Sequence, residues 1–325
     1  SSIRRESSAP SFRILAVAKG AELHLHKTTI SGGASVRYGD PSQGGGVGYG
    51  DPSQGGGVLN YGTFDVNSSS ISNNTSILGG GGIHSEGGTL IVRDSILAGN
   101  LAEGAGGAIS QVRNSGALIN VECSENTARL DGGCMWVGAT SNVNVTNNTI
   151  RGNFGKAGAG LRAEWNSVLI VNNSTLSENQ AWGRGGGVSN GSHATVFVLN
   201  STISNNTSDF YGGGLLAAGS LTLVKNSTVS GNLAPRGGGI VTGTSGTTKG
   251  TTMVMSSTIT LNQASQEGGG IINLSGGPLF LSHALVAGNI AMNQPSEVQD
   301  DTGSSIANAF NLFGYDGNAA LAGLN

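Results

Sequence analysis

The sequence predicts an all-β fold: a single right-handed parallel β-helix, or solenoid, of about ten coils, each about 26 residues long. Two markers recur along the chain with the same period, and short runs of alternating apolar and polar residues lie between them. Alternation with a period of two, rich in β-branched residues, is typical of strands. Short strands and turns at a fixed period are typical of a solenoid in which each coil pairs with the next.

The first marker is an Asn that follows an apolar residue, aliphatic in every case but Cys123, by three positions. The Asn residues are Asn74, Asn100, Asn126, Asn153, Asn179, Asn206, Asn232, Asn262 and Asn289. The residues three positions earlier are Ile71, Leu97, Cys123, Ile150, Leu176, Ile203, Val229, Ile259 and Val286. Coils about 4.8 Å apart make equivalent positions direct neighbours. We therefore expect a dry aliphatic column and a structural ladder of Asn side chains.

The second marker is a Gly pair or triplet that closes on an apolar residue. These apolar residues are Val58, Ile83, Ile109, Met135, Leu161, Val188, Leu215, Ile240 and Ile271. Glycine suits a turn that needs positive φ or a close approach between coils. The second marker therefore predicts one sharp turn per coil.

We expect one domain over residues 1–325. Residues 1–35 form the first coils, 36–59 an inserted loop, 60–295 the regular coils, and 296–325 a closing coil and C-terminal segment. The loop is assigned because a Gly-rich stretch beginning at Tyr38 is duplicated from Tyr49 onwards. Removing one copy brings Ile30 and Ile71 close to one coil apart. An error in the assembled sequence is the alternative explanation of the duplication.

Composition narrows the classes of function. The formal charge is −3, only 11% of residues are charged, and no run of Lys or Arg occurs, so we expect no nucleic-acid partner. No apolar run is long enough to predict a membrane span. The chain begins with Ser1 and is expected to be a processed or trimmed piece of a larger product. Abundant Asn, Ser, Thr and Gly favour an extracellular or cell-surface location.

The paired markers resemble the repeats of polymorphic outer membrane proteins. Examples are Gly106-Gly-Ala-Ile109 with Leu97 to Asn100, and Gly186-Gly-Val188 with Leu176 to Asn179. They are also similar to those of the wider group of bacterial β-helix proteins of the cell surface. The resemblance covers roughly residues 12–315 and implies an exported β-helix used in adhesion or as a stalk. Here an aliphatic residue replaces the Phe that usually precedes x-x-Asn.

A candidate ligand-facing edge precedes the Gly turns, with Lys156 close by. It consists of Asp131, Arg184, Tyr211, Arg236 and Glu267. Enzymes that cleave polysaccharides need clustered carboxylates, whereas charges alternate along this edge. We therefore predict no catalytic residues, and a solvated stripe with weak ion pairs explains the same pattern.

His24 and His26 alone are spaced to share a strand face, which is too few ligands for a metal site. No metal or other cofactor is expected.

Two further features stay open at the level of sequence. Asn147, Asn173, Asn200 and Asn226 each begin an Asn-x-Thr triplet in one column, which makes them candidate glycosylation sites. Turn and ladder chemistry explains the same residues. Cys123 and Cys134 are expected to be two buried free thiols, although a disulfide between them remains an alternative.

Three functions fit these patterns. We favour an extracellular structural or adhesive protein that assembles head to tail into a filament. Its partners would be copies of itself and surface glycans. The coils at the two ends would expose unpaired strand edges, and neither Ser1–Pro10 nor Asp301–Asn325 predicts a capping helix. The alternatives are a β-helix enzyme that binds or cleaves polysaccharide, as a lyase or hydrolase, and a passive stalk domain of a larger secreted adhesin.

Overall fold

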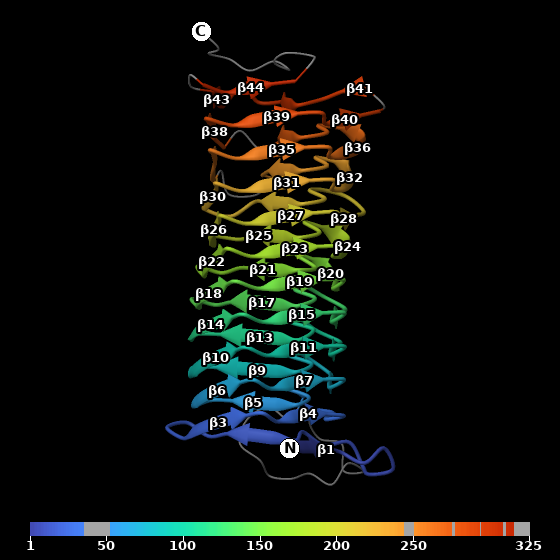
Figure 1. The fold of residues 1–325 in the computed structure, drawn as a ribbon, viewed down its shortest axis with the longest axis vertical. Helices are drawn as coiled ribbons and strands as arrows, with labels where there is room; N and C mark the ends of the chain where they lie inside the picture. Colours follow the sequence, from blue (N-terminus) through green and yellow to red (C-terminus); the bar gives the residue numbers. More distant parts are fainter. Residues whose placement is uncertain (36–52, 244–249, 275–276, 293, 308–309, 315–325) are drawn as a thin grey trace.

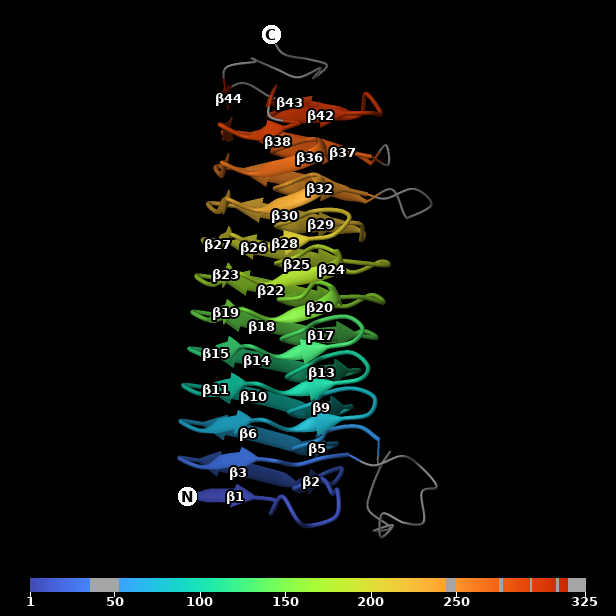
Figure 2. The ribbon, with the colours of Figure 1, turned by 90° about the vertical axis from the view of Figure 1, so that its right-hand side faces the viewer.

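The computed structural model describes residues 1–35, 53–243, 250–274, 277–292, 294–307 and 310–314. It confirms an all-β fold with one right-handed parallel β-helix of about ten coils and a period of about 27 residues. The coils stack into a straight rod that runs from β1 (Ser2–Arg4) at one end to β44 (Leu312–Phe313) at the other (Figures 1 and 2).

Four sheets, which we call A, B, C and D, run along the rod. Each regular coil adds one strand to every sheet, first to B and then to C, A and D. Sheet A contains β1 (Ser2–Arg4), β4 (Thr29–Ser31), β7 (Ser70–Ser72), β11 (Ile96–Ala98), β15 (Glu122–Ser124), β19 (Thr149–Arg151), β23 (Thr175–Ser177), β27 (Thr202–Ser204), β31 (Thr228–Ser230), β35 (Thr258–Thr260), β39 (Leu285–Ala287) and β44 (Leu312–Phe313). Sheet B contains β2 (Leu15–Val17), β5 (Val58–Asn60), β9 (Ile83–Glu86), β13 (Ile109–Val112), β17 (Met135–Gly138), β21 (Leu161–Ala163), β25 (Val188–Asn190), β29 (Leu215–Ala217), β33 (Ile240–Thr242), β37 (Ile271–Asn273) and β42 (Val298–Asp300).

Sheets C and D lie on opposite sides of the rod in Figure 1. Sheet C contains β3 (Glu22–His26), β6 (Thr63–Asn67), β10 (Thr89–Arg93), β14 (Ser115–Ile119), β18 (Asn142–Thr146), β22 (Val168–Asn172), β26 (Thr195–Leu199), β30 (Leu221–Lys225), β34 (Thr251–Met255), β38 (Leu279–Ser282) and β43 (Ser305–Ala307). Sheet D contains β8 (Thr75–Ser76), β12 (Leu101–Ala102), β16 (Thr127–Ala128), β20 (Phe154–Ala157), β24 (Gln180–Arg184), β28 (Thr207–Ser208), β32 (Leu233–Arg236), β36 (Gln263–Glu267), β40 (Ile290–Ala291) and β41 (Gln294–Pro295). The β40–β41 pair is antiparallel.

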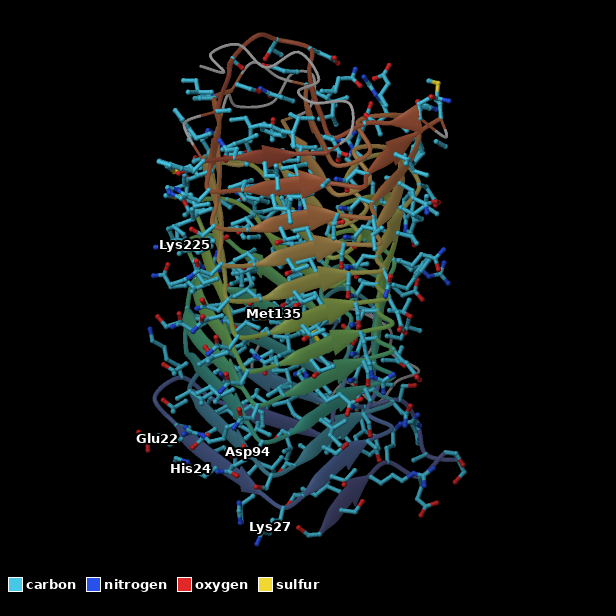
Figure 3. All side chains as sticks on the ribbon, turned by 45° about the horizontal axis from the view of Figure 1, so that its top comes forward. Glu22, His24, Lys27, Asp94, Met135 and Lys225 are labelled. Atoms are coloured by element: carbon cyan, nitrogen blue, oxygen red, sulfur yellow. A yellow bond between two sulfur atoms is a disulfide. The ribbon has the colours of Figure 1, made fainter. Side chains whose placement is uncertain are left out.

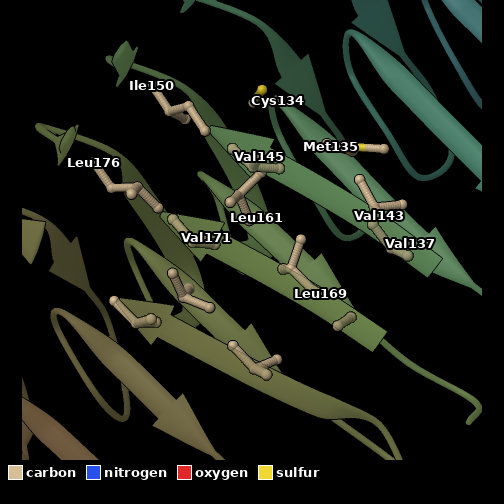
Figure 4. Packing of buried hydrophobic residues seen from close by; sticks show 14 of the residues in the cluster. Cys134, Met135, Val137, Val143, Val145, Ile150, Leu161, Leu169, Val171 and Leu176 are labelled. Carbon is tan, nitrogen blue, oxygen red and sulfur yellow. The ribbon is translucent and has the colours of Figure 1, made fainter. Parts of the chain in front are cut away.

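The core consists of inward-pointing residues, and equivalent residues of adjacent coils lie in register. Ile150 of β19 pairs with Leu176 of β23, and Leu161 of β21 pairs with Val188 of β25. All four side chains are fully buried, and Figure 4 shows how such residues from three sheets meet inside the coil. Burial of these aliphatic columns is the main favourable contribution to folding.

A ladder of buried Asn side chains runs beside the aliphatic column. Asn153 is typical: its backbone N–H and its Nδ2 both donate to Oδ1 of Asn179, at 3.1 and 2.9 Å. Its Nδ2 also donates to the carbonyl oxygen of Cys123 in the preceding coil, at 2.9 Å. The same amide contacts link all nine Asn residues named above. The ladder therefore satisfies backbone groups that the turn would otherwise leave buried without partners.

The two ends of the ladder depart from the repeat. At the first coil Gly33 occupies the Asn position, and its backbone N–H donates to Oδ1 of Asn74 at 2.9 Å. At the last coil Glu297, which is 1% exposed, replaces the next Asn as acceptor. Its Oε2 accepts from the backbone N–H and Nδ2 of Asn289, at 3.2 and 2.7 Å.

The inserted segment separates two coils that nevertheless pair directly. Ile30 of β4 lies beside Ile71 of β7, as the spacing predicted. Residues 36–52, which include most of the duplicated stretch from Tyr38 to Leu59, lie outside the described residues. The regular coil resumes at Val58 in β5, so the last two residues assigned to the loop belong to a strand.

The expectation of two free thiols was wrong, because Cys123 and Cys134 form a disulfide with Cα atoms 6.0 Å apart. Cys123 occupies the aliphatic column in β15, and Cys134 immediately precedes β17, so both side chains point into the interior of one coil. The sequence alone could not show this, since the turn around Asn126 brings the two residues together.

Candidate functional site

A cleft of about 420 Å³ opens where sheet D meets the outer face of sheet B, along the middle coils. Strands β20, β21, β24 and β29 and the turns beside them contribute its walls. Its lining includes Asp131, Lys156, Arg162, Trp182, Arg184, Phe210 and Leu216. Because aromatic and charged side chains meet in this one cleft, it is the candidate site.

Strand alternation directs Trp182 and Arg184 of β24 into this cleft. Gln180, Trp182 and Arg184 point outward, whereas Ala181 and Gly183 are buried. A Cβ at Gly183 would lie 2.5 Å from the carbonyl oxygen of Lys156, so this position needs glycine. The register also shifts between Gly155 and Ala157 of the neighbouring β20. Such a bulge re-aims side chains at the edge of a sheet.

Aromatic side chains form the exposed wall of the cleft. Trp182 is 38% exposed, and the ammonium nitrogen of Lys156 lies 5.5 Å from its ring centre. Phe210 is 56% exposed at the same wall, and Phe154 lies beside Trp182 in an adjoining shallow hollow. Exposed aromatic rings grouped beside a cleft are typical of surfaces that bind ligands. The wall therefore offers a flat apolar surface next to a cation.

The floor of the cleft is a charged network around Arg162, whose side chain is only 12% exposed. Its Nε lies 3.8 Å from Asp131 Oδ2, and its Nη2 donates to Glu164 Oε1. Glu164 also accepts a hydrogen bond from Trp136 Nε1 at 3.3 Å. Burial raises the pKa of the Asp131 carboxyl and nearby Glu164 adds to the rise, although Arg162 and Lys156 act in the opposite direction. Asp131 therefore holds its proton to a higher pH than an ordinary Asp.

The predicted ligand-facing edge forms a column, but only part of it lines the cleft. Arg184, Tyr211, Arg236 and Glu267 are neighbours on successive coils. The guanidinium carbons of Arg184 and Arg236 lie 5.6 and 5.8 Å from the Tyr211 ring centre, on its two sides. Arg236 also donates to Glu267 at 2.5 and 2.9 Å. Asp131 and Arg184 reach the cleft, whereas the other three continue along the edge beyond it.

Sequence reasoning missed Arg162, Trp182 and Phe210. A signal was present, since all three Trp residues of the chain fall within residues 136–182. In a chain with only 5% aromatic residues, that concentration marks a few neighbouring coils as different from the rest.

The remaining predicted sites lie elsewhere. Asn147, Asn173, Asn200 and Asn226 are exposed at the turns between sheets C and A, with φ between 49° and 59°. Asn226 Nδ2 donates to Asn200 Oδ1 at 3.3 Å, and glycosylation of this column stays a prediction. Within the described residues, no group of three or more His, Cys, Asp or Glu side chains is placed to hold a metal ion.

Comparison with known proteins identifies the class. Residues 56–234 match the family described as the right-handed beta helix region. The match covers more than half of the chain and includes every residue that lines the cleft, so the chain belongs to this family. Neither the curated proteins nor the solved structures yielded a match. In the part of the chain that the structure describes, no helix has the length and apolar character needed to cross a membrane.

Proposed function

We propose that this protein is an extracellular adhesive β-helix that binds polysaccharide, with acidic sugars as the preferred ligand, in the cleft beside Trp182. The main support for this proposal is the exposed Trp182 ring, which has Lys156 over it and lies at the mouth of the cleft. An aromatic ring can cover the apolar face of a sugar, and a few placed polar groups orient the ligand.

Charge favours an acidic sugar. Lys156, Arg162 and Arg184 line the cleft against a single lining carboxylate, that of Asp131. A guanidinium group matches the geometry of a carboxylate or sulfate, and an ammonium group binds either as a point charge. Arg162 is already engaged by Asp131 and Glu164. Lys156 and Arg184, both exposed, are therefore the residues that we assign to the anionic groups of the ligand.

An extracellular location fits this proposal. The Cys123–Cys134 disulfide is chemistry of oxidising compartments. The Gly-Gly-x-Ile and x-x-Asn repeats, similar to those of polymorphic outer membrane proteins, favour a bacterial cell-surface protein.

Binding is tested by affinity electrophoresis in gels that contain polygalacturonate, alginate or neutral dextran. We expect the acidic polymers to retard the native protein. Trp182→Ala should weaken binding at least about tenfold, which is the effect expected when one stacking contact between an aromatic ring and a sugar is lost. Trp165→Ala is the matched control, since Trp165 is an exposed Trp of the same coil that does not line the cleft. Equal loss in both variants, or no retardation by any polymer, would contradict the proposal.

A second candidate is cleavage of the bound polysaccharide. Asp131 favours it, because a carboxyl that stays protonated to higher pH is suited to act as a general acid. Formation of new reducing or unsaturated ends on incubation with the acidic polymers, lost in Asp131→Asn, would support an enzyme. Binding without new ends would support an adhesive protein.

Head-to-tail assembly is a separate proposal. Strands β3 and β43 end sheet C, so each has one edge without a strand neighbour among the described residues. Electron microscopy of the undenatured protein tests it. Continuous filaments with an axial repeat near one rod length would support assembly, and isolated rods would contradict it.

A further inference from the structure

The outer face of sheet C changes character along the rod. In the strands from β3 to β18 it carries mostly polar and charged side chains, including Glu22, His24, Asp65, Arg93 and Asn144. In the six strands from β22 to β43 it is mostly apolar. The apolar outward residues are Val168, Ile170, Phe197, Leu199, Leu221, Leu223, Met253, Met255, Phe280 and Ile306. We call this region the apolar face of sheet C.

A central column of six large side chains forms the apolar face. The register places Ile170, Phe197, Leu223, Met253, Phe280 and Ile306 on successive strands. Five of the six are partly exposed, and Ile306 is 50% exposed. Lys225 at the margin is the only charged residue that points outward from these six strands, and Figure 3 shows it on the same side of the rod as Glu22 and His24.

A contiguous apolar surface of this kind marks an interaction site. Six strands about 4.8 Å apart and about 17 Å long present roughly 500 Å² of sheet surface. Two such faces packed together bury roughly 1,000 Å², which is the lower bound for a specific protein–protein interface. A second copy of the face therefore supplies enough area for a stable pair.

The order of residues in the central column identifies this second copy as the partner. Read from either end, the column runs Ile, Phe, Leu or Met, Met or Leu, Phe, Ile. A two-fold axis between Leu223 and Met253, perpendicular to the rod, would place Phe197 against Phe280 of the second copy. It would likewise bring Ile170 to the partner's Ile306. A symmetric interface requires such a self-complementary patch.

We propose that two copies of this chain pair face to face through the apolar face of sheet C, with their rods antiparallel. The packing is sheet on sheet, about 10 Å apart. The antiparallel arrangement points the coils that carry Glu22, Asp65 and Arg93 of the two copies in opposite directions, so those charges stay in water. Parallel rods would bury them against like groups at a cost. This pairing is independent of ligand binding in the cleft, which opens between sheets B and D.

Sedimentation equilibrium of the full chain tests the pairing. We expect a dimer at micromolar concentrations. Phe197→Asp should raise its dissociation constant at least about thirtyfold, because a charge would enter the centre of the interface. Asn144→Asp, on the polar part of the same sheet, is the matched control and should leave the constant unchanged. A monomeric native protein, or a dimer that resists Phe197→Asp while circular dichroism shows the variant folded, overturns the proposal.

Cross-linking tests the orientation without a destabilising charge. Ile170→Cys and Ile306→Cys, which the two-fold axis places opposite each other, are made as separate variants, mixed and treated with a short bis-maleimide, because two sheets about 10 Å apart are too far for a disulfide. The antiparallel pair predicts a covalent dimer that joins the two variants, with little dimer in either variant alone. Efficient cross-linking of Ile170→Cys to itself would indicate parallel rods and overturn the antiparallel arrangement, as would the absence of cross-links in the mixture.

Discussion

The Asn ladder and the cleft wall lie only a few residues apart along the chain, the ladder in the turn before β24 and the wall on β24 itself, yet they differ in burial and in periodicity. Asn179 is fully buried and repeats in nearly every coil, whereas Trp182, three residues later in the chain, is exposed and has no aromatic equivalent in the next coil. An inward position contacts the same position in the coils above and below, so one side chain must suit them all. An outward position is free of that constraint, and the contrast shows where a repeat protein can acquire function.

The largest effect is expected inside. In Asn179→Ala, the backbone N–H and Nδ2 of Asn153 lose the acceptor that now lies 3.1 and 2.9 Å away, and the carbonyl oxygen of Ile150 loses a donor. Buried groups left without partners cost about 1–3 kcal/mol each, so we expect a loss of about 4 kcal/mol in the free energy of unfolding. Urea denaturation measures it. Asn144→Ala, at an exposed position of β18, should cost under about 0.5 kcal/mol. If both variants lost the same free energy of unfolding, the proposed difference between inward and outward positions would be wrong.

The second prediction concerns the one place where the aliphatic column is broken. Replacing Cys123 and Cys134 together by Ala removes the covalent link across the coil and should lower the free energy of unfolding by about 2–4 kcal/mol. Urea denaturation of the double variant, and of the native protein with and without reductant, measures the change. If reduction leaves the native protein as stable as before, the link contributes nothing to the interior.

A third, smaller effect on stability is expected at the wall. Trp182→Ala should change the free energy of unfolding by under about 1 kcal/mol, because the ring packs mainly against Lys156 and solvent. Thermal unfolding monitored by circular dichroism measures this. The same variant is expected to lose polysaccharide binding. A large loss of stability would show that Trp182 supports the fold and would weaken its assignment to the ligand.

The smallest effect is a pH dependence at the cleft floor. The raised pKa of Asp131 means that the folded protein holds this proton at pH values where the unfolded chain, with an ordinary value near 3.8, has released it. Asp131 therefore favours folding less as the pH rises through its raised pKa. We expect Asp131→Asn to be more stable than the native protein at neutral pH, with a difference that shrinks as the pH falls toward 4. Asp209→Asn, an exposed carboxylate on the same side of the rod, controls for the loss of charge. A difference that grows on acidification would contradict the sign.

Much of the fold could be predicted from the sequence because every coil uses the same residue types at the same positions. The Asn and Gly markers gave the period, and the pairing of Ile30 with Ile71 across the inserted segment agreed with the spacing. The ends of the ladder did not follow. Glu297 closes it with an acceptor of a different residue type, and a search for repeated Asn passes over it. A residue that replaces the repeated Asn in a single coil can be recognised only from its contacts in the structure.

The candidate site followed less well for the same reason. Asp131 and Arg184 were found because they precede Gly turns, which are part of the repeat. Arg162 and Phe210 sit at other positions of the coil and meet Trp182 only where sheet D faces sheet B. No spacing along the chain expresses a contact between the outer sides of two sheets.

By itself, the sequence determined the β-helix, its period, the aliphatic column and the Asn ladder. These depend on contacts between equivalent positions of adjacent coils, which a periodic sequence encodes directly. The tertiary structure alone decided that Cys123 meets Cys134, that Arg162 joins Asp131 to Glu164, and that sheet C has an apolar half. The first two depend on how far each turn rotates the chain and which sheets then face each other. The third depends on which alternate residues of each strand point outward, and that is fixed only once the coil has closed.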